Sequence, residues 1–447
     1  MTSPFETSSP SREIDLLIDA RWIIPVEPKG VVLENHALAV DHGRIVALAP
    51  IADAEARFAP KQRVSLPGHV LMPGLVNLHT HAALTLLRGY ADDLPLMRWL
   101  EEKIWPAEAK HVSADFVRDG TLLAAAEMLR GGITCCNDMY FFPEASVEAM
   151  QRAGMRAAIG IITVEFPTAY ATDPDDYLDK GLAVRDHYRD APLISFCLAP
   201  HAPYSVSDRS FERVATLAAQ LDLPVHIHVH ETSAEIDESI RQHGVRPLER
   251  LRRLGLLGPG LIAVHGIHLN DEEINLLATH GSSIAHCPTS NMKLASGGAP
   301  IAAVLAKGVR VGLGTDGAAS NNRLDLFQEM RHAGLLGKLL SGDAAALDAH
   351  TLLSMATLEG AAALGLDGKI GSLVPGKEAD LCAIRIDDWM LQPCFDPASH
   401  LVYVAGRENV SHVWVAGKPV VSEGQLHDID ITKLIEIASV WQNTIRS

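Results

Sequence analysis

Short apolar runs alternate with helix-like segments through the middle of the chain. Segments such as 207–221 and 271–280 place apolar residues at helical spacing. The apolar runs between such segments are nearly continuous, as strands buried on both faces are. The eight runs are 71–81, 132–139, 156–163, 193–200, 224–231, 261–267, 282–291 and 309–317. Eight βα repeats predict an α/β fold, a closed (β/α)8 TIM barrel whose active site lies at the carboxyl ends of its strands.

Both ends of the chain have a different pattern, which indicates a small β domain. Residues 37–40 and 44–48 are apolar runs that flank Asp41-His42-Gly43, a sequence suited to a hairpin turn. A β pattern returns at 371–381. We therefore expect the two termini to pack together as one discontinuous β-sandwich. The predicted boundaries are 1–70 and 371–447 for the sandwich and 71–370 for the catalytic barrel.

Composition limits the partners and the compartment. The chain has 447 residues, 47% of them hydrophobic, and a net charge of −17. An acidic chain repels nucleic acid and anionic membranes, so we expect neither as a partner. The first residues lack the pattern of a secretory signal, and no apolar run is long enough to span a bilayer. The six cysteines show no disulfide-framework spacing, so we expect a cytoplasmic protein.

The first predicted barrel strand ends in His79-Thr80-His81. Residues two apart on a strand share a face, so both imidazoles reach one point at the strand end. That geometry suits a metal ion. A lone His-x-His pair is better explained by two hydrogen-bonded core histidines, so the metal hypothesis needs further ligands from other strands.

Further ligand candidates lie at the ends of the fifth and eighth predicted strands. A catalytic zinc site has about three or four protein ligands and an open position for water. The predicted ligands are His79, His81, His228 and Asp316. On the fifth strand, His226 lies deeper and is predicted to be a packing residue, and His230 is the alternative ligand.

Together the strand-end motifs resemble the amidohydrolase superfamily. They are His79-x-His81, His228-x-x-Glu231, His265-Gly266, His286-Cys287-Pro288-x-Ser290-Asn291 and Thr315-Asp316-Gly317. Binuclear members of the superfamily use a carboxylated lysine on strand four, but residues 193–200 contain no lysine. This departure favours one divalent metal ion. We expect Zn²⁺, with iron and manganese left open by the donor set.

Within the superfamily the chain resembles the 5′-methylthioadenosine/S-adenosylhomocysteine deaminases. The resemblance lies in Trp105-Pro106-x-Glu108, within the long connection after the first strand, and in Ala199-Pro200-His201-Ala202-Pro203-Tyr204. It implies a small-molecule purine nucleoside substrate, deaminated at C6 to an inosine-type product and ammonia. It also implies that Glu108 and His201 bind the ribose and that Trp105 walls the pocket. The family resemblance also suggests a homodimer or a higher homo-oligomer.

The same resemblance assigns catalytic roles. We expect Asp316 to take the proton of the metal-activated water, Glu231 to bind the purine and protonate N1, and His265 to orient the attacking oxygen. The alternative for Glu231 and His265 is that they hold a ligand's tautomer. The alternative for Glu108 is a solvated residue of a charged helix. His286 and Asn291 are predicted to shape a loop.

Several substrate assignments remain open at this point. Methylthioadenosine is the expected substrate, beside S-adenosylhomocysteine and adenosine; a cation such as Arg156 would hold the tail of S-adenosylhomocysteine. Guanine deamination and triazine dechlorination or deamination use similar metal motifs. Glu231 with His265 favours N1-protonating deamination, and Glu108 with His201 favours a ribosyl substrate. A non-enzymatic barrel kept for assembly is disfavoured because all four ligands are present.

Overall fold

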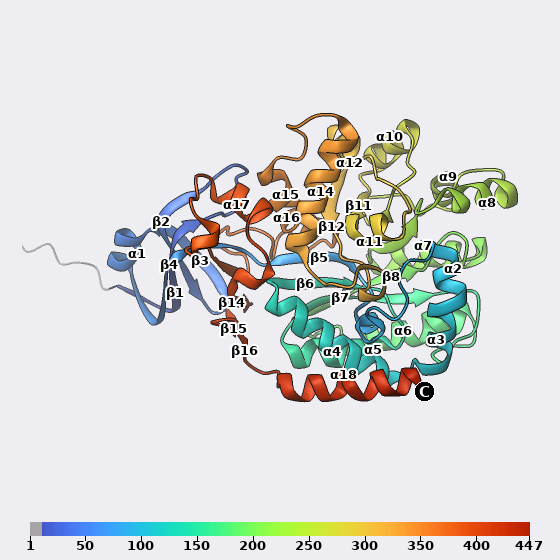
Figure 1. The fold of residues 1–447 in the computed structure, drawn as a ribbon, viewed down its shortest axis with the longest axis horizontal. Helices are drawn as coiled ribbons and strands as arrows, with labels where there is room; N and C mark the ends of the chain where they lie inside the picture. The colour runs from blue at the N-terminus through green and yellow to red at the C-terminus, as the bar shows by residue number, and fades with distance from the viewer. Residues whose placement is uncertain (1–10) are drawn as a thin grey trace, which may run out of the picture.

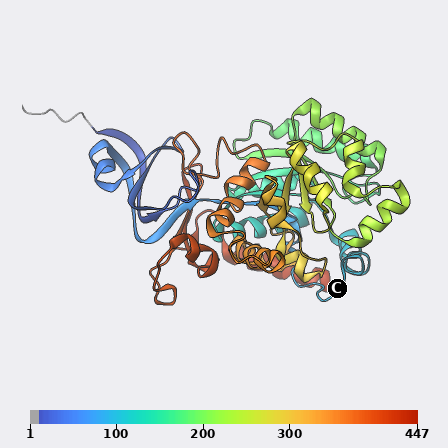
Figure 2. The ribbon, with the colours of Figure 1, turned by 90° about the horizontal axis from the view of Figure 1, so that it is seen from above.

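The computed structural model describes residues 11–447 and contains two eight-stranded sheets (Figures 1 and 2). One sheet is parallel and follows chain order. Its strands are β5 (Leu75–Thr80), β6 (Ile133–Asp138), β7 (Arg156–Thr163), β8 (Ile194–Pro200), β9 (Val225–Val229), β10 (Leu261–His265), β11 (Ser283–His286) and β12 (Arg310–Leu313). These strands and the separate terminal sheet confirm the predicted fold class. Residues 1–10, which include most of the segment assessed as a signal, lie outside the described residues.

Helices surround the barrel strands (Figure 2). They are α4 (Ala114–Arg130), α5 (Pro143–Ala153), α6 (Pro174–Tyr188), α7 (Asp208–Leu221), α8 (Ser233–His243), α9 (Pro247–Arg253), α10 (Asp271–His280), α11 (Pro288–Lys293), α12 (Ile301–Ala306), α13 (Ala318–Asn321), α14 (Leu326–Ser341), α15 (Ala349–Met355) and α16 (Leu358–Ala363). The long connection after β5 holds η1 (Ala82–Leu87), α2 (Leu96–Trp99), η2 (Leu100–Ile104) and α3 (Trp105–His111). Because helices cover the strands, nearly every strand residue is buried, which explains the continuous apolar runs.

The two faces of strand β9 have different surroundings. Val225, Ile227 and Val229 join the core cluster beneath the helices. The intervening His226 and His228 face the barrel interior, opposite Ile262 and Val264 of β10 in the strand register. Burying each large aliphatic side chain contributes about 1.5–3 kcal/mol. The apolar face therefore stabilises the barrel, and the face that carries the histidines is available for binding or catalysis.

The barrel closes where its first and last strands meet. Asp316 N–H donates to His79 O over 3.0 Å. Below it, Asn77 and Thr315 exchange two hydrogen bonds of 2.8 and 2.9 Å. A Cβ atom on Gly314 would lie 2.9 Å from the Cβ of His79. Glycine at 314 thus lets the two strand ends approach, and the seam places Asp316 beside the histidines of β5.

The terminal sheet combines strands from both ends of the chain. They are β1 (Arg12–Ile23), β2 (Leu33–Asp41), β3 (Arg44–Pro50) and β4 (Phe58–Pro73), then β13 (Leu381–Arg385), β14 (Val410–Val415), β15 (Lys418–Ser422) and β16 (Gln425–Leu426). β4 pairs with β13 and so joins the two halves into one mixed sheet. β2 and β3 form the predicted hairpin, with positive φ at His42 and Gly43. The division into domains at residues 70 and 370 stays a prediction.

Three further α-helices and two short 3-10 helices account for the remaining helical segments of residues 11–447. They are α1 (Ile51–Arg57), α17 (Pro397–Tyr403), α18 (Ile431–Arg446), η3 (Trp389–Leu391) and η4 (Arg407–Asn409). α18 lies along α4 of the barrel, away from the terminal sheet (Figure 1). Trp441 Nε1 donates to Asp119 Oδ2 over 2.8 Å, and its ring meets that of Phe116 edge-on. The sequence pattern did not predict this position. No helix among the described residues is both long and apolar enough to cross a membrane.

Arg156 connects the barrel to the terminal sheet and is not near the substrate mouth. It begins β7, at the amino end of the strand, and is buried. Its guanidinium binds Asp380 over 2.9 Å and Glu378 over 2.6 Å. The suggestion that Arg156 binds a substrate tail is therefore wrong, because both of its charge partners and its burial hold it at the opposite end of the barrel.

Candidate metal centre and substrate cavity

Four side chains from three strand ends converge inside the barrel mouth. His79 lies near the end of β5 with His81 just beyond it, His228 lies on β9, and Asp316 follows β12. His79 Nε2 is 3.2 Å from His228 Nε2 and 3.3 Å from Asp316 Oδ1. His81 Nε2 is 3.4 Å from the same oxygen. The structure brings together all four residues predicted as ligands.

These separations fit one metal ion. With bonds of about 2.0–2.1 Å, two ligands of a tetrahedral zinc ion lie about 3.3 Å apart. The ring nitrogens of His79, His81 and His228 all lie within 4.8 Å of one another. Three imidazoles and one carboxylate are a donor set that divalent transition metals accept. The residues present therefore fit the proposed group.

His79 is oriented by a second histidine in the barrel interior. Its Nδ1 is 2.9 Å from His226 Nε2. Burial lowers the pKa of His79 to about 4 and that of His226 well below its ordinary value, so both rings are neutral near pH 7. With the proton on Nδ1, His79 presents the lone pair of Nε2 to the centre. His226 is buried as predicted, but its part in holding the tautomer was not foreseen.

The other two histidines predicted as ligands are held by main-chain carbonyl groups. His81 Nδ1 donates to Met139 O over 2.6 Å, and His228 Nδ1 donates to His201 O over 2.8 Å. Burial lowers the pKa of His228 well below its ordinary value. In the neutral tautomer that donates from Nδ1, each ring turns the lone pair of Nε2 toward the centre.

Asp316 has a different environment at each carboxylate oxygen. Oδ1 faces the histidines and accepts the Gly317 N–H over 2.7 Å. Oδ2 accepts hydroxyl hydrogens from Ser290 over 2.6 Å and Ser320 over 3.0 Å. The two serines fix the carboxylate plane, so one oxygen stays directed at the metal position. Ser320 carried no signal in the sequence, since it lies beyond the strand-end motif.

Glu231 lies just beyond β9 and His265 is the last residue of β10, and both face the same point. Glu231 Oε2 is 3.7 Å from His265 Nε2, and both side chains are buried. Burial raises the pKa of Glu231, which favours its protonated form. His265 Nδ1 is 2.9 Å from Asn291 Oδ1. Asn291 therefore does more than shape a loop, as it fixes the tautomer of His265.

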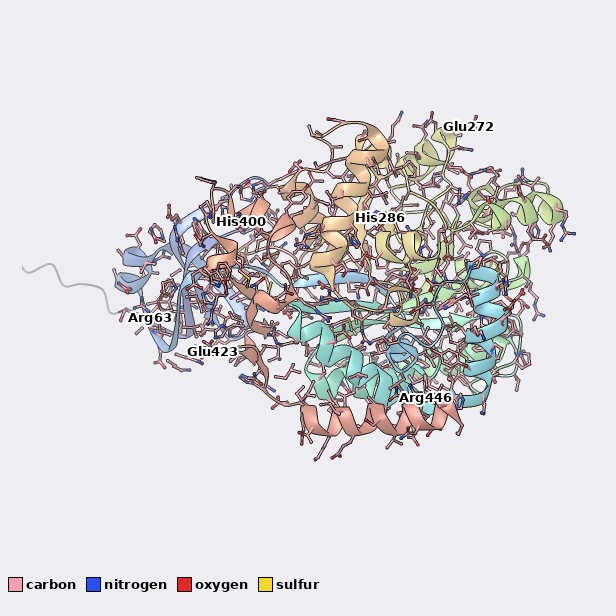
Figure 3. The ribbon with its side chains drawn as sticks, viewed as in Figure 1. Arg63, Glu272, His286, His400, Glu423 and Arg446 are labelled. Carbon is pink, nitrogen blue, oxygen red and sulfur yellow. The ribbon has the colours of Figure 1, made fainter. Side chains whose placement is uncertain are left out.

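Two other histidines lie outside the centre. His230, the alternative ligand, turns away from it, and its Nε2 accepts the Leu248 N–H over 3.2 Å. His286 was predicted to lie in a loop, but it is the last residue of β11 and is buried. Pro288 ends the strand early because it begins helix α11. Figure 3 shows His286 near the middle of the barrel.

A cavity of about 590 Å³ opens over the metal position, and apolar and aromatic side chains form most of its wall. Its polar lining includes His81, His228, Glu231, His265 and Asp316. The predicted substrate residues Trp105, Glu108 and His201 line it too. A largely apolar pocket with a few convergent polar groups is typical of a small-molecule site.

Glu108 lies in the cavity wall and is half-buried. Tyr140 OH donates to Glu108 Oε1 over 2.7 Å, which leaves Oε2 for a ligand. Burial raises the pKa of Glu108 to about 7. This environment differs from that of a solvated helix residue. Tyr140 was missed from sequence, although its place directly beyond a barrel strand was a signal for the mouth.

His201 serves the site through both its main chain and its ring. Its carbonyl group holds His228, as described above. Its Nδ1 is 2.8 Å from Ser205 Oγ, and the ring lines the cavity. Burial lowers the pKa of His201 to about 3, so the ring is a neutral hydrogen-bonding group.

A family comparison fits this geometry. The model of the Amidohydrolase family matches residues 70–420. The chain belongs to this family. The resemblance predicted from the strand-end motifs is confirmed.

Relatives match the amidohydrolase over nearly its whole length. A protein of Teredinibacter turnerae is 49% identical over 97% of this chain and 98% of its own length. One of Saccharophagus degradans is 46% identical, with 97% of each chain covered. Both are named 5-methylthioadenosine/S-adenosylhomocysteine deaminase.

Solved structures share the fold and contain zinc. An adenosine deaminase from Xanthomonas campestris with bound zinc has a TM-score of 0.97 and 51% identity, covering 98% of this chain and 100% of its own. Atrazine chlorohydrolase from Arthrobacter aurescens, complexed with zinc, has a TM-score of 0.87 and 25% identity, covering 95% and 99%. The chain is thus a metal-dependent hydrolase.

The hydrogen bond between His226 and His79 can be tested by substitution of His226. We expect His226→Leu to weaken metal binding about 10- to 100-fold, because the His79 Nδ1 proton loses its acceptor. Competition with a chromogenic chelator measures the affinity. His69→Leu removes another buried histidine, on β4 of the terminal sheet, and should leave the metal affinity unchanged. Equal affinities in wild type and His226→Leu would show that His226 does not orient the ligand.

Proposed function

We propose that the chain is a zinc-dependent deaminase that hydrolyses 5′-methylthioadenosine at purine C6, releasing ammonia and leaving the inosine-type product. S-adenosylhomocysteine and adenosine are further candidate substrates. The observation that carries the proposal is the position of Glu231 and His265. They face each other at 3.7 Å beside the convergence point of the ligands, in the cavity that Glu108 also lines.

The names of the relatives and the zinc of the Xanthomonas campestris structure support this choice. The cytoplasmic location and the homodimer or higher oligomer stay predictions from the sequence, as does the exclusion of nucleic acid and membrane partners. A triazine is the alternative substrate class, since a triazine-acting enzyme shares the fold at 25% identity. Guanine is a third class to test.

The metal held by His79, His81, His228 and Asp316 would activate the hydrolytic water. Asp316 accepts the proton that this water gives up as it adds to C6. Buried Glu231, in its protonated form, donates its proton to N1, and the π electron pair of the C6–N1 double bond moves onto N1 as the oxygen adds. His265 Nδ1 donates to Asn291 Oδ1, so His265 Nε2 accepts a hydrogen bond from the hydrolytic water and orients its oxygen. The proton held by Asp316 then passes to the amino group, which leaves as ammonia, and the C6 hydroxyl returns a proton to Glu231 as the C6 carbonyl forms.

The walls of the cavity position the nucleoside. In this proposal Glu108 Oε2 accepts ribose hydroxyl hydrogens, while Tyr140 holds the other oxygen in place. His201 contacts the same sugar, and Trp105 covers it. These groups select a ribosyl substrate over a free base and fix C6 above the metal position.

The substrate assignment is tested by adenine absorbance. Wild type should deaminate methylthioadenosine rapidly, and removal of the metal by a chelator should abolish the reaction. Parallel assays with S-adenosylhomocysteine, adenosine, guanine and a chlorotriazine rank the alternatives. A metal-loaded protein that leaves methylthioadenosine intact would contradict the proposal, and turnover of guanine or the triazine would replace it.

The role of Glu231 gives a second test. Glu231→Gln keeps the shape of the side chain but removes the acidic proton, so kcat should fall about 10²- to 10⁴-fold. Metal content should stay at the wild-type level because Glu231 is not a ligand. Wild-type turnover in this variant would exclude Glu231 as the acid.

Glu108 makes binding depend on pH. Its pKa is raised to about 7, so the carboxylate is protonated below pH 7 and ionised above it. The ionised form accepts ribose hydroxyl hydrogens more strongly. We expect KM for methylthioadenosine to fall as pH rises through about 7. In Glu108→Gln, KM should be about tenfold or more higher at pH 8 and show no such step; a step that persists would assign the titration elsewhere.

A further inference from the structure

The turn after β9 must direct two side chains into the same cavity. It presents His228 to the metal position and Glu231 to the same cavity, although residues three apart on a strand point to opposite faces. The chain solves this at His230, whose φ is 58°. A residue other than glycine is strained in this left-handed conformation, so surrounding contacts must hold it there.

Glu235 supplies those contacts from the first turn of α8. Its Oε1 accepts the His230 N–H over 3.0 Å, and its Oε2 accepts the Glu231 N–H over 2.8 Å. Thr232 is the N-cap of α8, and its hydroxyl accepts the Glu235 N–H over 3.2 Å. The glutamate of an ordinary capping box would return to the N-cap N–H. Glu235 instead reaches past Thr232 to the two residues of the turn.

The environment of Glu235 is costly for a carboxylate. The residue is 7% exposed, and no lysine or arginine forms an ion pair with it among residues 11–447. Burial raises its pKa to about 7, while the two main-chain hydrogen bonds lower the pKa. Helix capping alone would not require burial of an unpaired acid, since Thr232 already caps α8.

We propose that Glu235 is a positioning residue for the deamination: by holding both N–H groups of the turn, it fixes the direction in which Glu231 meets the purine N1. This inference rests on the proposed function only for the role of Glu231. The main-chain contact itself is independent of the reaction. A displacement of about 1 Å in a reacting group costs about 10²-fold in rate, so the hold on the turn has a large catalytic effect.

The first experiment compares Glu235→Gln with Ser239→Ala. Glutamine keeps one acceptor oxygen but turns an NH2 group toward the second N–H. The turn therefore loses one of the two hydrogen bonds that hold it. We expect kcat to fall about 10- to 100-fold while KM and zinc content stay within twofold of wild type. Ser239→Ala removes a buried hydrogen bond at the other end of α8, to Val245 O, and should leave kcat unchanged. Wild-type kcat in Glu235→Gln would overturn the proposal.

A double-mutant cycle tests whether Glu235 acts through Glu231. In the Glu231→Gln background, Glu235→Gln should lower kcat no further, because the group that it positions is already lost. An equal further loss in that background would show that Glu235 acts by another route and would contradict the proposal.

Amide hydrogen exchange separates this proposal from the proposed function. Mass spectrometry of the peptide that covers His230 and Glu231 needs no substrate. Glu235→Gln should speed exchange there, whereas Ser239→Ala should not. If wild type proves inactive on every nucleoside, the proposed function fails while faster exchange still supports the hold on the turn. Unchanged exchange in Glu235→Gln would overturn the positioning role even in an active enzyme.

Discussion

One main-chain hydrogen bond, from Asp316 N–H to His79 O, determines much of the site. It joins the last barrel strand to the first and so brings a carboxylate beside two imidazoles that are distant in sequence. The side-chain pair of Asn77 and Thr315 holds the same seam. A close-packed seam needs a residue without a side chain at 314, where even a methyl group would strike His79. Closing the barrel and assembling the ligands are therefore the same event.

Strain marks the residues that leave the strands. His230, His265 and Asp316 all have left-handed φ, of 58°, 71° and 60°. Each lies at the carboxyl end of a barrel strand, where a regular strand would send the side chain to the wrong face. Such conformations persist only where neighbouring groups over-determine them. Neighbouring side chains hold each strained residue in place. The two serines hold Asp316, Asn291 holds His265, and Glu235 holds His230.

Local pattern predicted the barrel well because each apolar run is buried by its own neighbours. The run at 156–163 is β7 residue for residue, but the run at 282–291 shortens to Ser283–His286, since Pro288 begins a helix. Ligand candidates were predictable because strand ends in a barrel must meet. The contacts of His226 and Tyr140 were not, because they depend on which side chains face each other across the interior. No local spacing encodes that information.

The terminal sheet has a consequence for how the molecule is made. β4 is synthesised early, but its partner β13 begins only at Leu381, so β4 keeps an open edge while the whole barrel leaves the ribosome. Helix α18, which packs through Trp441 against the apolar cluster beside the cavity, is synthesised after the strands of this sheet. A nascent chain therefore completes its barrel before its sheet, and the exposed edge of β4 needs protection from aggregation until translation ends.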